Sequence, residues 1–99
     1  RGALAVSGPT QPDGRMTFGE ALVMLNAGRL VARAGWNGKG MWVRRIDLYN
    51  DREFSVREQP GARGTWLPFL AMKTVDSGLV PWLASQTDML ATDWVVVEP

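Results

Sequence analysis

The 99-residue sequence contains no cysteine and no histidine. The first absence excludes disulfides and thiolate nucleophiles, and the second excludes every catalytic triad or proton relay built on imidazole. The usual Cys and His ligands of zinc and haem are missing as well. Apolar runs such as Val95-Val96-Val97 are far shorter than the roughly 20 residues of a membrane-spanning helix. We therefore expect no membrane partner, no metal and no cofactor.

The charge of the chain is nearly balanced, with a net value of +1. Between Arg29 and Arg63, however, there are eight basic residues and four acidic ones. This excess is too small for binding to duplex DNA, which usually requires a strongly basic face. It suits a compact anionic ligand that carries one or two phosphates.

The chain has the length of a single small domain, yet it contains five tryptophans. Such a small core does not need so much rigid aromatic surface, so we expect some indoles to face a ligand or a partner subunit. Residues 1–15 mix Gly, Pro and small side chains, and we interpret them as an N-terminal extension or an expression remnant before a single domain at 16–99. Alternatively, Leu4 and Val6 belong to an additional strand.

The apolar pattern predicts an α+β fold: one N-terminal helix, an antiparallel sheet and a short C-terminal helical turn. A helix at about 17–27 begins with a Thr17/Glu20 capping box and ends at Gly28. Turn signals at 73–81 predict a hairpin, and polar residues at 49–65 predict a loop. The expected strands are 30–33, 41–48, 66–73, 79–83 and 93–97, and the expected helical turn is 85–91.

Trp36 lies in a glycine-rich turn, Ala34-Gly35-Trp36-Asn37-Gly38-Lys39-Gly40. The glycines would let a ligand approach backbone amides, which bind phosphate when they form a concave nest. A purine stacked on the indole gains about 1–3 kcal/mol, and Arg33 and Lys39 place cations on both sides. Alternatively, Trp36 closes the end of the sheet and the glycines only form the turn. The local pattern is compatible with both.

Ser85-Gln86-Thr87-Asp88 places four hydrogen-bonding side chains in one turn. In one interpretation Ser85 or Thr87 caps a helix and Asp88 favours its positive end. In the other, Gln86 and Asp88 contact base edges or ribose hydroxyls. An acid/base pair of Asp88 and Asp93 is disfavoured, because the chain has no histidine and no evident partner base.

Several segments resemble the Thoeris anti-defence protein two family over roughly residues 16–97. The similar segments are MTFGEA at 16–21, RAGWNGKGM at 33–41, PFLAMKT at 68–74, VPWLASQTDMLA at 80–91 and DW at 93–94. This resemblance implies a phage protein of the host cytoplasm that sequesters cyclic ADP-ribose isomers, such as glycocyclic ADP-ribose, without cleaving them. Some members also hold the cyclic di- or trinucleotides of CBASS defence. The family forms homotetramers with pockets between subunits.

Carried over to this chain, the resemblance implies that Trp36 stacks on adenine with Asn37 and Arg33 beside it. From chemistry alone we add Lys39, Gln86 and Asp88 as candidate phosphate, base or ribose contacts. We expect a binding protein rather than an enzyme. The alternatives are a small nucleotide hydrolase that uses Asp88 and Asp93, and an adaptor that binds a host protein.

Overall fold

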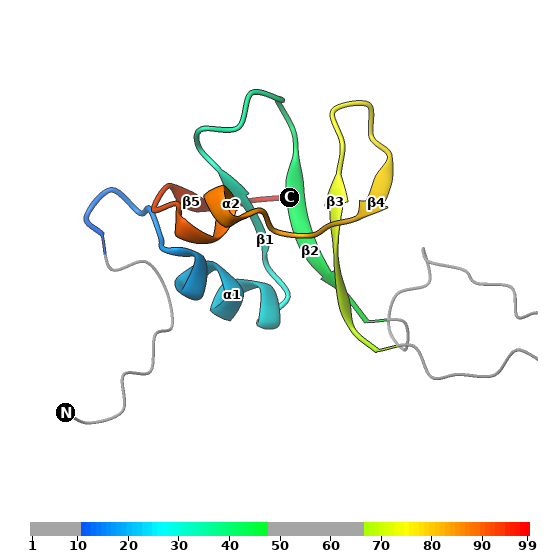
Figure 1. Cartoon of the computed structure of the whole chain (residues 1–99), viewed down its shortest axis with the longest axis horizontal. Helices are drawn as coiled ribbons and strands as arrows, with labels where there is room; N and C mark the ends of the chain where they lie inside the picture. The colour runs from blue at the N-terminus through cyan, green and yellow to red at the C-terminus, as the bar shows by residue number, and fades with distance from the viewer. Residues whose placement is uncertain (1–10, 48–66) are drawn as a thin grey trace, which may run out of the picture.

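A computed structural model describes residues 11–47 and 67–99 of the chain (Figure 1). The predicted loop at 49–65 and the alternative strand through Leu4 and Val6 lie outside the described residues. Of the predicted strand 66–73, the structure describes the part from Leu67 onward.

The N-terminal helix α1 spans Phe18–Asn26 and begins as the sequence predicts. The Thr17 hydroxyl accepts a hydrogen bond from the Glu20 amide at 3.2 Å, and the Glu20 carboxylate accepts one from the Thr17 amide at 2.8 Å. These two bonds satisfy amides that have no partner within the helix. The helix ends where Gly28 adopts a positive φ of 85°, a conformation that glycine adopts without steric cost.

Five antiparallel strands form one sheet in the order β4-β3-β2-β1-β5. Because the last strand pairs with the first, residues from both ends of the domain lie side by side. The predicted α+β class with an antiparallel sheet is confirmed. The strands are β1 Leu30–Arg33, β2 Trp42–Ile46, β3 Phe69–Lys73, β4 Leu79–Pro81 and β5 Trp94–Val97.

Three strands are more than one residue shorter than predicted. β2 spans Trp42–Ile46 within the predicted 41–48, and β3 and β4 are each limited by a proline. β3 begins at Phe69, directly after Pro68, and β4 ends at Pro81 rather than continuing to Leu83. Proline has no backbone N–H to donate to a neighbouring strand, so it is tolerated at strand ends and on edge strands. The hairpin predicted at 73–81 is confirmed, with its turn between Thr74 and Gly78.

The second helix, α2, spans Gln86–Leu90 and is capped by Ser85. The Ser85 hydroxyl accepts from the Asp88 amide at 3.0 Å, while the Asp88 carboxylate accepts from the Ser85 amide at 3.4 Å. The predicted helical turn is therefore confirmed. One carboxylate oxygen of Asp88 is used for capping, which fixes the orientation of the side chain.

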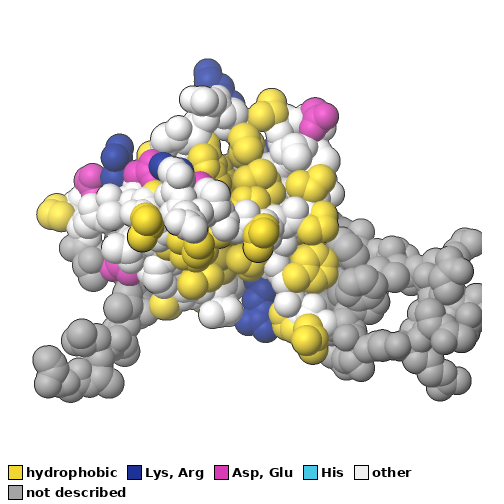
Figure 2. Space-filling view, viewed as in Figure 1, with side chains coloured by type: hydrophobic (Ala, Val, Ile, Leu, Met, Phe, Trp, Pro, Cys, Tyr) yellow, Lys and Arg dark blue, Asp and Glu magenta, His cyan; other side chains and the backbone are white. Residues whose placement is uncertain are grey.

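The core lies between α1 and the β2-β1-β5 part of the sheet. Trp94 is fully buried at its centre, and the chain just before α1 is tied to it by two backbone hydrogen bonds between Met16 and Trp94. Figure 1 shows β3 and β4 extending beyond both helices, and apolar side chains gather over these strands in Figure 2. The other fully buried large side chains are Met16, Leu25, Ile46, Val31 and Val43.

The capping box of α1 is expected to contribute measurably to stability. Thr17→Ala removes the hydroxyl acceptor and should lower the free energy of unfolding by about 1 kcal/mol. Urea denaturation followed by circular dichroism measures this change. Thr87→Ala, at an exposed position in α2, is the matched control and should change the value by less than about 0.5 kcal/mol. Equal effects of the two substitutions would contradict the role assigned to Thr17.

Candidate functional site

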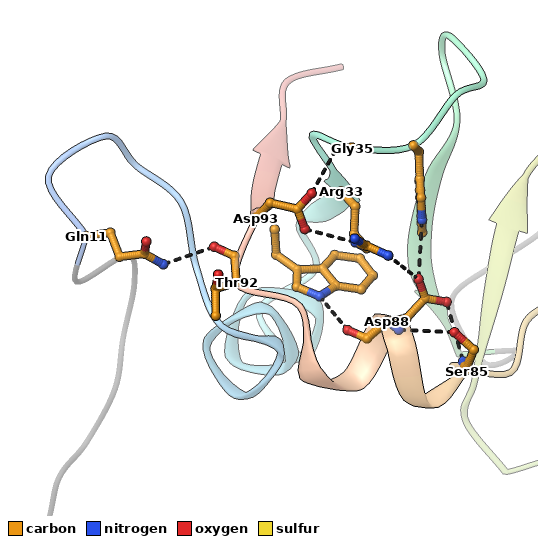
Figure 3. Close-up of polar contacts among 9 residues, drawn as sticks. Gln11, Arg33, Gly35, Ser85, Asp88, Thr92 and Asp93 are labelled. Carbon is orange, nitrogen blue, oxygen red and sulfur yellow. Dashed lines mark hydrogen bonds and ion pairs between the residues drawn. The ribbon is translucent and has the colours of Figure 1, made fainter.

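Figure 3 shows the side chains of Asp88 and Asp93 directed toward the guanidinium of Arg33, and the indole N–H of Trp36 joins this cluster at Asp88. Arg33 is the last residue of β1, and Trp36 lies in the Trp36 turn, which we define as residues 34–40. Asp88 belongs to α2, and Asp93 immediately precedes β5. The pairing of β1 with β5 sets Arg33 opposite Trp94, so that Asp93 lies next to the guanidinium group.

Arg33 is held between two carboxylates. Its Nε donates to Asp93 Oδ1 at 2.9 Å, and its Nη1 donates to Asp88 Oδ1 at 3.0 Å. The side chain of Arg33 is 19% exposed, and those of Asp88 and Asp93 are 14% and 19% exposed. The three groups together carry a formal charge of −1, so the positive charge of Arg33 is already compensated within the chain.

The pKa values at this cluster favour the charged forms of all three groups. The hydrogen bonds from Arg33 to Asp93 and then to Asp88 raise the pKa of the guanidinium. Burial alone would raise the pKa of Asp88, but hydrogen bonds from Arg33, Ser85 and Trp36 outweigh it and lower that pKa. Burial opposes ionisation of Asp93 in the same way, and donation from Arg33 and the Gly35 amide lowers its pKa.

Trp36 is partly exposed and packs on the aromatic side of the core. Its ring stands edge-on to Trp94, with 5.4 Å between centroids, and edge-on to Trp82, with 6.4 Å between centroids. Its Nε1 donates a long hydrogen bond of 3.4 Å to Asp88 Oδ1. The ring therefore closes this end of the core, as one of the two sequence interpretations expects, and it keeps a solvent-accessible part.

Two of the three glycines of the Trp36 turn, Gly35 and Gly38, leave no room for a Cβ beside neighbouring atoms of the chain. The Gly35 amide donates to Asp93 Oδ2 at 2.8 Å, and a Cβ at this position would lie 2.8 Å from the same oxygen. At Gly38 a Cβ would collide with the side chains of Met41 and Val75. The expectation that glycine opens backbone amides to a phosphate is thus wrong at Gly35, because the Asp93 carboxylate already binds that amide.

The other predicted contacts lie outside the hydrogen-bonded cluster. Asn37, Lys39 and Gln86 are exposed, the first two in the Trp36 turn and the third in α2. Lys73 Nζ donates to the Gly40 carbonyl at 2.9 Å and so lies at the far end of the same turn. Of the six predicted site residues, the structure brings together Arg33, Trp36 and Asp88.

Asp93 is the residue whose place the sequence reasoning missed. The sequence suggests for Asp93 only an acid/base pair with Asp88, whereas in the structure its carboxylate binds both Arg33 and the Trp36 turn. The sequence does show a charged residue directly before the final strand. Which residue Asp93 contacts, however, depends on which strand pairs with β5. That pairing joins residues about 60 positions apart, and local patterns do not specify it.

Within 11–47 and 67–99, no group of three or more His, Cys, Asp or Glu side chains is placed to hold a metal ion. In the same ranges, no helix has the length and apolar character needed to cross a bilayer.

The fold and the cluster define a small α+β protein in which an arginine and two carboxylates support a tryptophan-bearing turn. Residues 16–97 match the family model of the Thoeris anti-defense 2-like domain. The sequence is also 40% identical over 86 residues to Thoeris anti-defense 2 of Bacillus phage SP01, a match that covers 84% of this chain and 96% of the phage protein. The chain therefore belongs to the Thoeris anti-defense 2-like family.

The lowered pKa values of Asp88 and Asp93 predict a loss of stability in acid. In the unfolded chain these carboxyls regain their ordinary pKa of 3.8, so below about that pH the unfolded state binds more protons than the folded one. The stabilisation is present above this value and is lost as the pH falls through the lower folded values. Urea unfolding at a series of pH values measures the effect.

The variant Asp88→Asn should flatten this acidic dependence, because it removes one of the two titrating groups. Asp76→Asn is the surface control: the pKa of Asp76 is also lowered, mainly by a hydrogen bond from Thr74, but solvent screens a fully exposed group. An acidic dependence that is the same in wild type and in Asp88→Asn would contradict the assignment.

Proposed function

We propose that this protein is a phage-type anti-defence protein that binds and sequesters a cyclic ADP-ribose-type signal of the Thoeris system without cleaving it. Glycocyclic ADP-ribose is the ligand that we test first, and the cyclic oligonucleotides of CBASS defence are proposed as further ligands. The site of action is the host cytoplasm, where such signals are made. Family membership, together with a partly exposed indole in a rigid turn, is the main support for this proposal.

Trp36 supplies the surface on which a nucleobase stacks. Its ring is held on one side by Trp82, Trp94 and Asp88, so little conformational freedom is lost when a base covers the remaining part. Base stacking on an aromatic side chain is worth about 1–3 kcal/mol. Asn37 and Lys39 extend from the same turn into solvent and supply an amide and a cation for the ribose and phosphate groups.

Sequestration acts by mass action and needs tight binding rather than a reaction. A nanomolar dissociation constant corresponds to about 12 kcal/mol. Stacking supplies about 1–3 kcal/mol of this, and several charge-assisted hydrogen bonds at about 1.5–3 kcal/mol each supply the rest in a pre-formed site. Because the ligand is held intact, the free signal falls below the concentration that its effector requires.

The geometry of Asp88 and Asp93 argues for binding rather than hydrolysis. A hydrolase that uses two carboxyls needs one of them protonated at working pH to act as a general acid. Both carboxyls here accept hydrogen bonds from Arg33, and both have lowered pKa values. They remain ionised at neutral pH and serve Arg33 and the backbone instead.

We also propose that the protein assembles as a homotetramer through apolar side chains beside α2. Leu83 is 93% exposed and Leu90 is 79% exposed, and β4 presents Leu79 and Val80 to solvent. Figure 2 shows apolar side chains gathered over this part of the molecule. Exposed apolar patches of this kind are typical of protein interfaces. An adaptor that binds a host protein would use the same surface, so the mass of the purified protein distinguishes the two.

Removal of the stacking ring should weaken ligand binding. Trp36→Leu is expected to reduce the affinity for glycocyclic ADP-ribose by about 5- to 150-fold, the equivalent of about 1–3 kcal/mol. Titration calorimetry measures the affinity. Trp42→Leu is the matched control, because the alternation of side chains along β2 directs Trp42 away from the face that carries Val43 and the core. Equal affinity of wild type and Trp36→Leu would refute the stacking role.

The same samples test whether the ligand stays intact. After incubation with wild type the protein is denatured and the released nucleotide is identified by mass spectrometry. Sequestration requires recovery of the unmodified cyclic ligand in stoichiometric amounts. Linear ADP-ribose in the released fraction would show hydrolysis and overturn the proposal.

Assembly should depend on the exposed leucines. The double variant Leu83→Ser, Leu90→Ser is expected to shift the protein from a tetramer to a smaller species, with unchanged circular dichroism because these side chains are largely outside the core of the subunit. Light scattering coupled to size exclusion measures the mass. Leu22→Ser, at an exposed position of α1, is the control. A wild-type protein that is monomeric at micromolar concentration would contradict the proposed tetramer.

A further inference from the structure

Asp93 binds the last residue of β1 and the first two residues of the Trp36 turn. Its carbonyl oxygen accepts from the Ala34 amide at 2.9 Å, and its Oδ2 accepts from the Gly35 amide at 2.8 Å. Its Oδ1 accepts from Arg33 Nε at 2.9 Å. Three successive residues are thus bound by one residue of another segment, directly before Trp36.

A second connection joins Asp93 to the ring of Trp36. The guanidinium of Arg33 that Asp93 orients donates at 3.0 Å to Asp88 Oδ1, and the same oxygen accepts from Trp36 Nε1. Asp88 is itself held by capping α2 through Ser85. The backbone before Trp36 and the polar edge of its ring are therefore both connected to Asp93 (Figure 3).

The Asp93 carboxylate is also positioned so that a ligand gains little by contacting it. Both of its oxygens already accept hydrogen bonds from this chain, and its side chain is only 19% exposed. The backbone of Gly35 approaches so closely that a Cβ there would lie 2.8 Å from Oδ2. The exposed polar side chains of the Trp36 turn, Asn37 and Lys39, follow Trp36 in the sequence, whereas Asp93 binds the residues before it.

We propose that Asp93 is a positioning residue, which sets the Trp36 turn in its binding conformation without contacting the ligand. This inference rests on the proposed function of Trp36 in stacking. When Asp93 is lost, residues 34–36 gain conformational freedom, and binding must then order them again at a cost in affinity. In this proposal Arg33 is a positioning residue as well, because it donates to Asp88 and so orients the carboxylate that binds the Trp36 indole. Its positive charge is compensated by Asp88 and Asp93 and is therefore not available to attract a phosphate.

The test combines a readout that needs no ligand with a measurement of affinity. Two variants are compared with wild type: Asp93→Asn keeps one side-chain oxygen as an acceptor, and Asp93→Ala keeps no side-chain acceptor, while both retain the backbone carbonyl that binds the Ala34 amide. The ligand-free readout is the ¹H–¹⁵N resonance of the Trp36 indole, assigned by its absence in Trp36→Phe. We expect this resonance to shift or broaden in both variants, more strongly in Asp93→Ala, while the indole resonance of Trp42 stays in place.

Affinity for glycocyclic ADP-ribose is expected to fall by about tenfold in Asp93→Asn and further in Asp93→Ala. Gly35→Ala disrupts the hydrogen bond between the Gly35 amide and Asp93 Oδ2 from the side of the turn. It should both shift the Trp36 resonance and lower the affinity, so it tests the positioning role even if Asp93→Ala does not fold. Glu98→Gln is the matched control, because Glu98 directly follows β5 and forms an exposed ion pair with Arg29 at 2.8 Å, away from the Trp36 turn.

An unchanged Trp36 resonance in both Asp93→Asn and Gly35→Ala would overturn the positioning role, and so would equal displacement of the Trp36 and Trp42 resonances, which indicates a general loss of structure. If wild type fails to bind any cyclic ADP-ribose isomer, the proposed function fails. The resonance of Trp36 in the variants then still supports or overturns the positioning of the turn by Asp93.

Discussion

The contact of Arg33 with Asp88 and Asp93 is the interaction on which the candidate site depends. Through side-chain hydrogen bonds it joins the end of β1 to the helix α2 and to the residue that precedes β5. Ion pairs on an open surface contribute little to stability, but this one is largely shielded, and each carboxylate also binds the backbone of its surroundings. Breaking one member would leave a partly buried charge without compensation. The cluster thus acts as a single unit that defines where the Trp36 turn begins.

Of the three tryptophans that pack together, one lies in the core and two remain partly exposed at the proposed binding face. Trp94 is fully buried and donates its indole N–H to the Asp88 carbonyl at 2.9 Å, which ties α2 to the final strand. Trp36 and Trp82 pack against it at steep angles and remain partly exposed. A protein that must hold a flat nucleobase benefits from this arrangement, because a ring already fixed by its neighbours loses little entropy on binding.

The proposed assembly and the proposed binding are linked through α2. This short helix carries Asp88, which contacts Arg33 and Trp36, and it ends at the highly exposed Leu90, while Leu83, which is also highly exposed, precedes it in the chain. Association of subunits at these leucines would bring the polar face of α2 close to another copy of the chain. Such an arrangement would allow two subunits to enclose a ligand that one small domain is too shallow to cover.

The sequence by itself determined the local elements, because capping boxes, glycine stops and alternation are properties of neighbouring residues. It predicted α1 from Thr17 to Gly28, the hairpin at 73–81 and a helical turn at 85–91 capped by Ser85 or Thr87, and it indicated Trp36 as the central residue of a glycine-rich turn. Only the tertiary structure decided that β5 pairs with β1 and so places Asp93 beside Arg33 and Gly35. The physical reason is that this pairing is a long-range choice among apolar strands of similar character. As a consequence, the guanidinium of Arg33, which the sequence suggested as a contact for phosphate, is hydrogen-bonded to two carboxylates of the same chain.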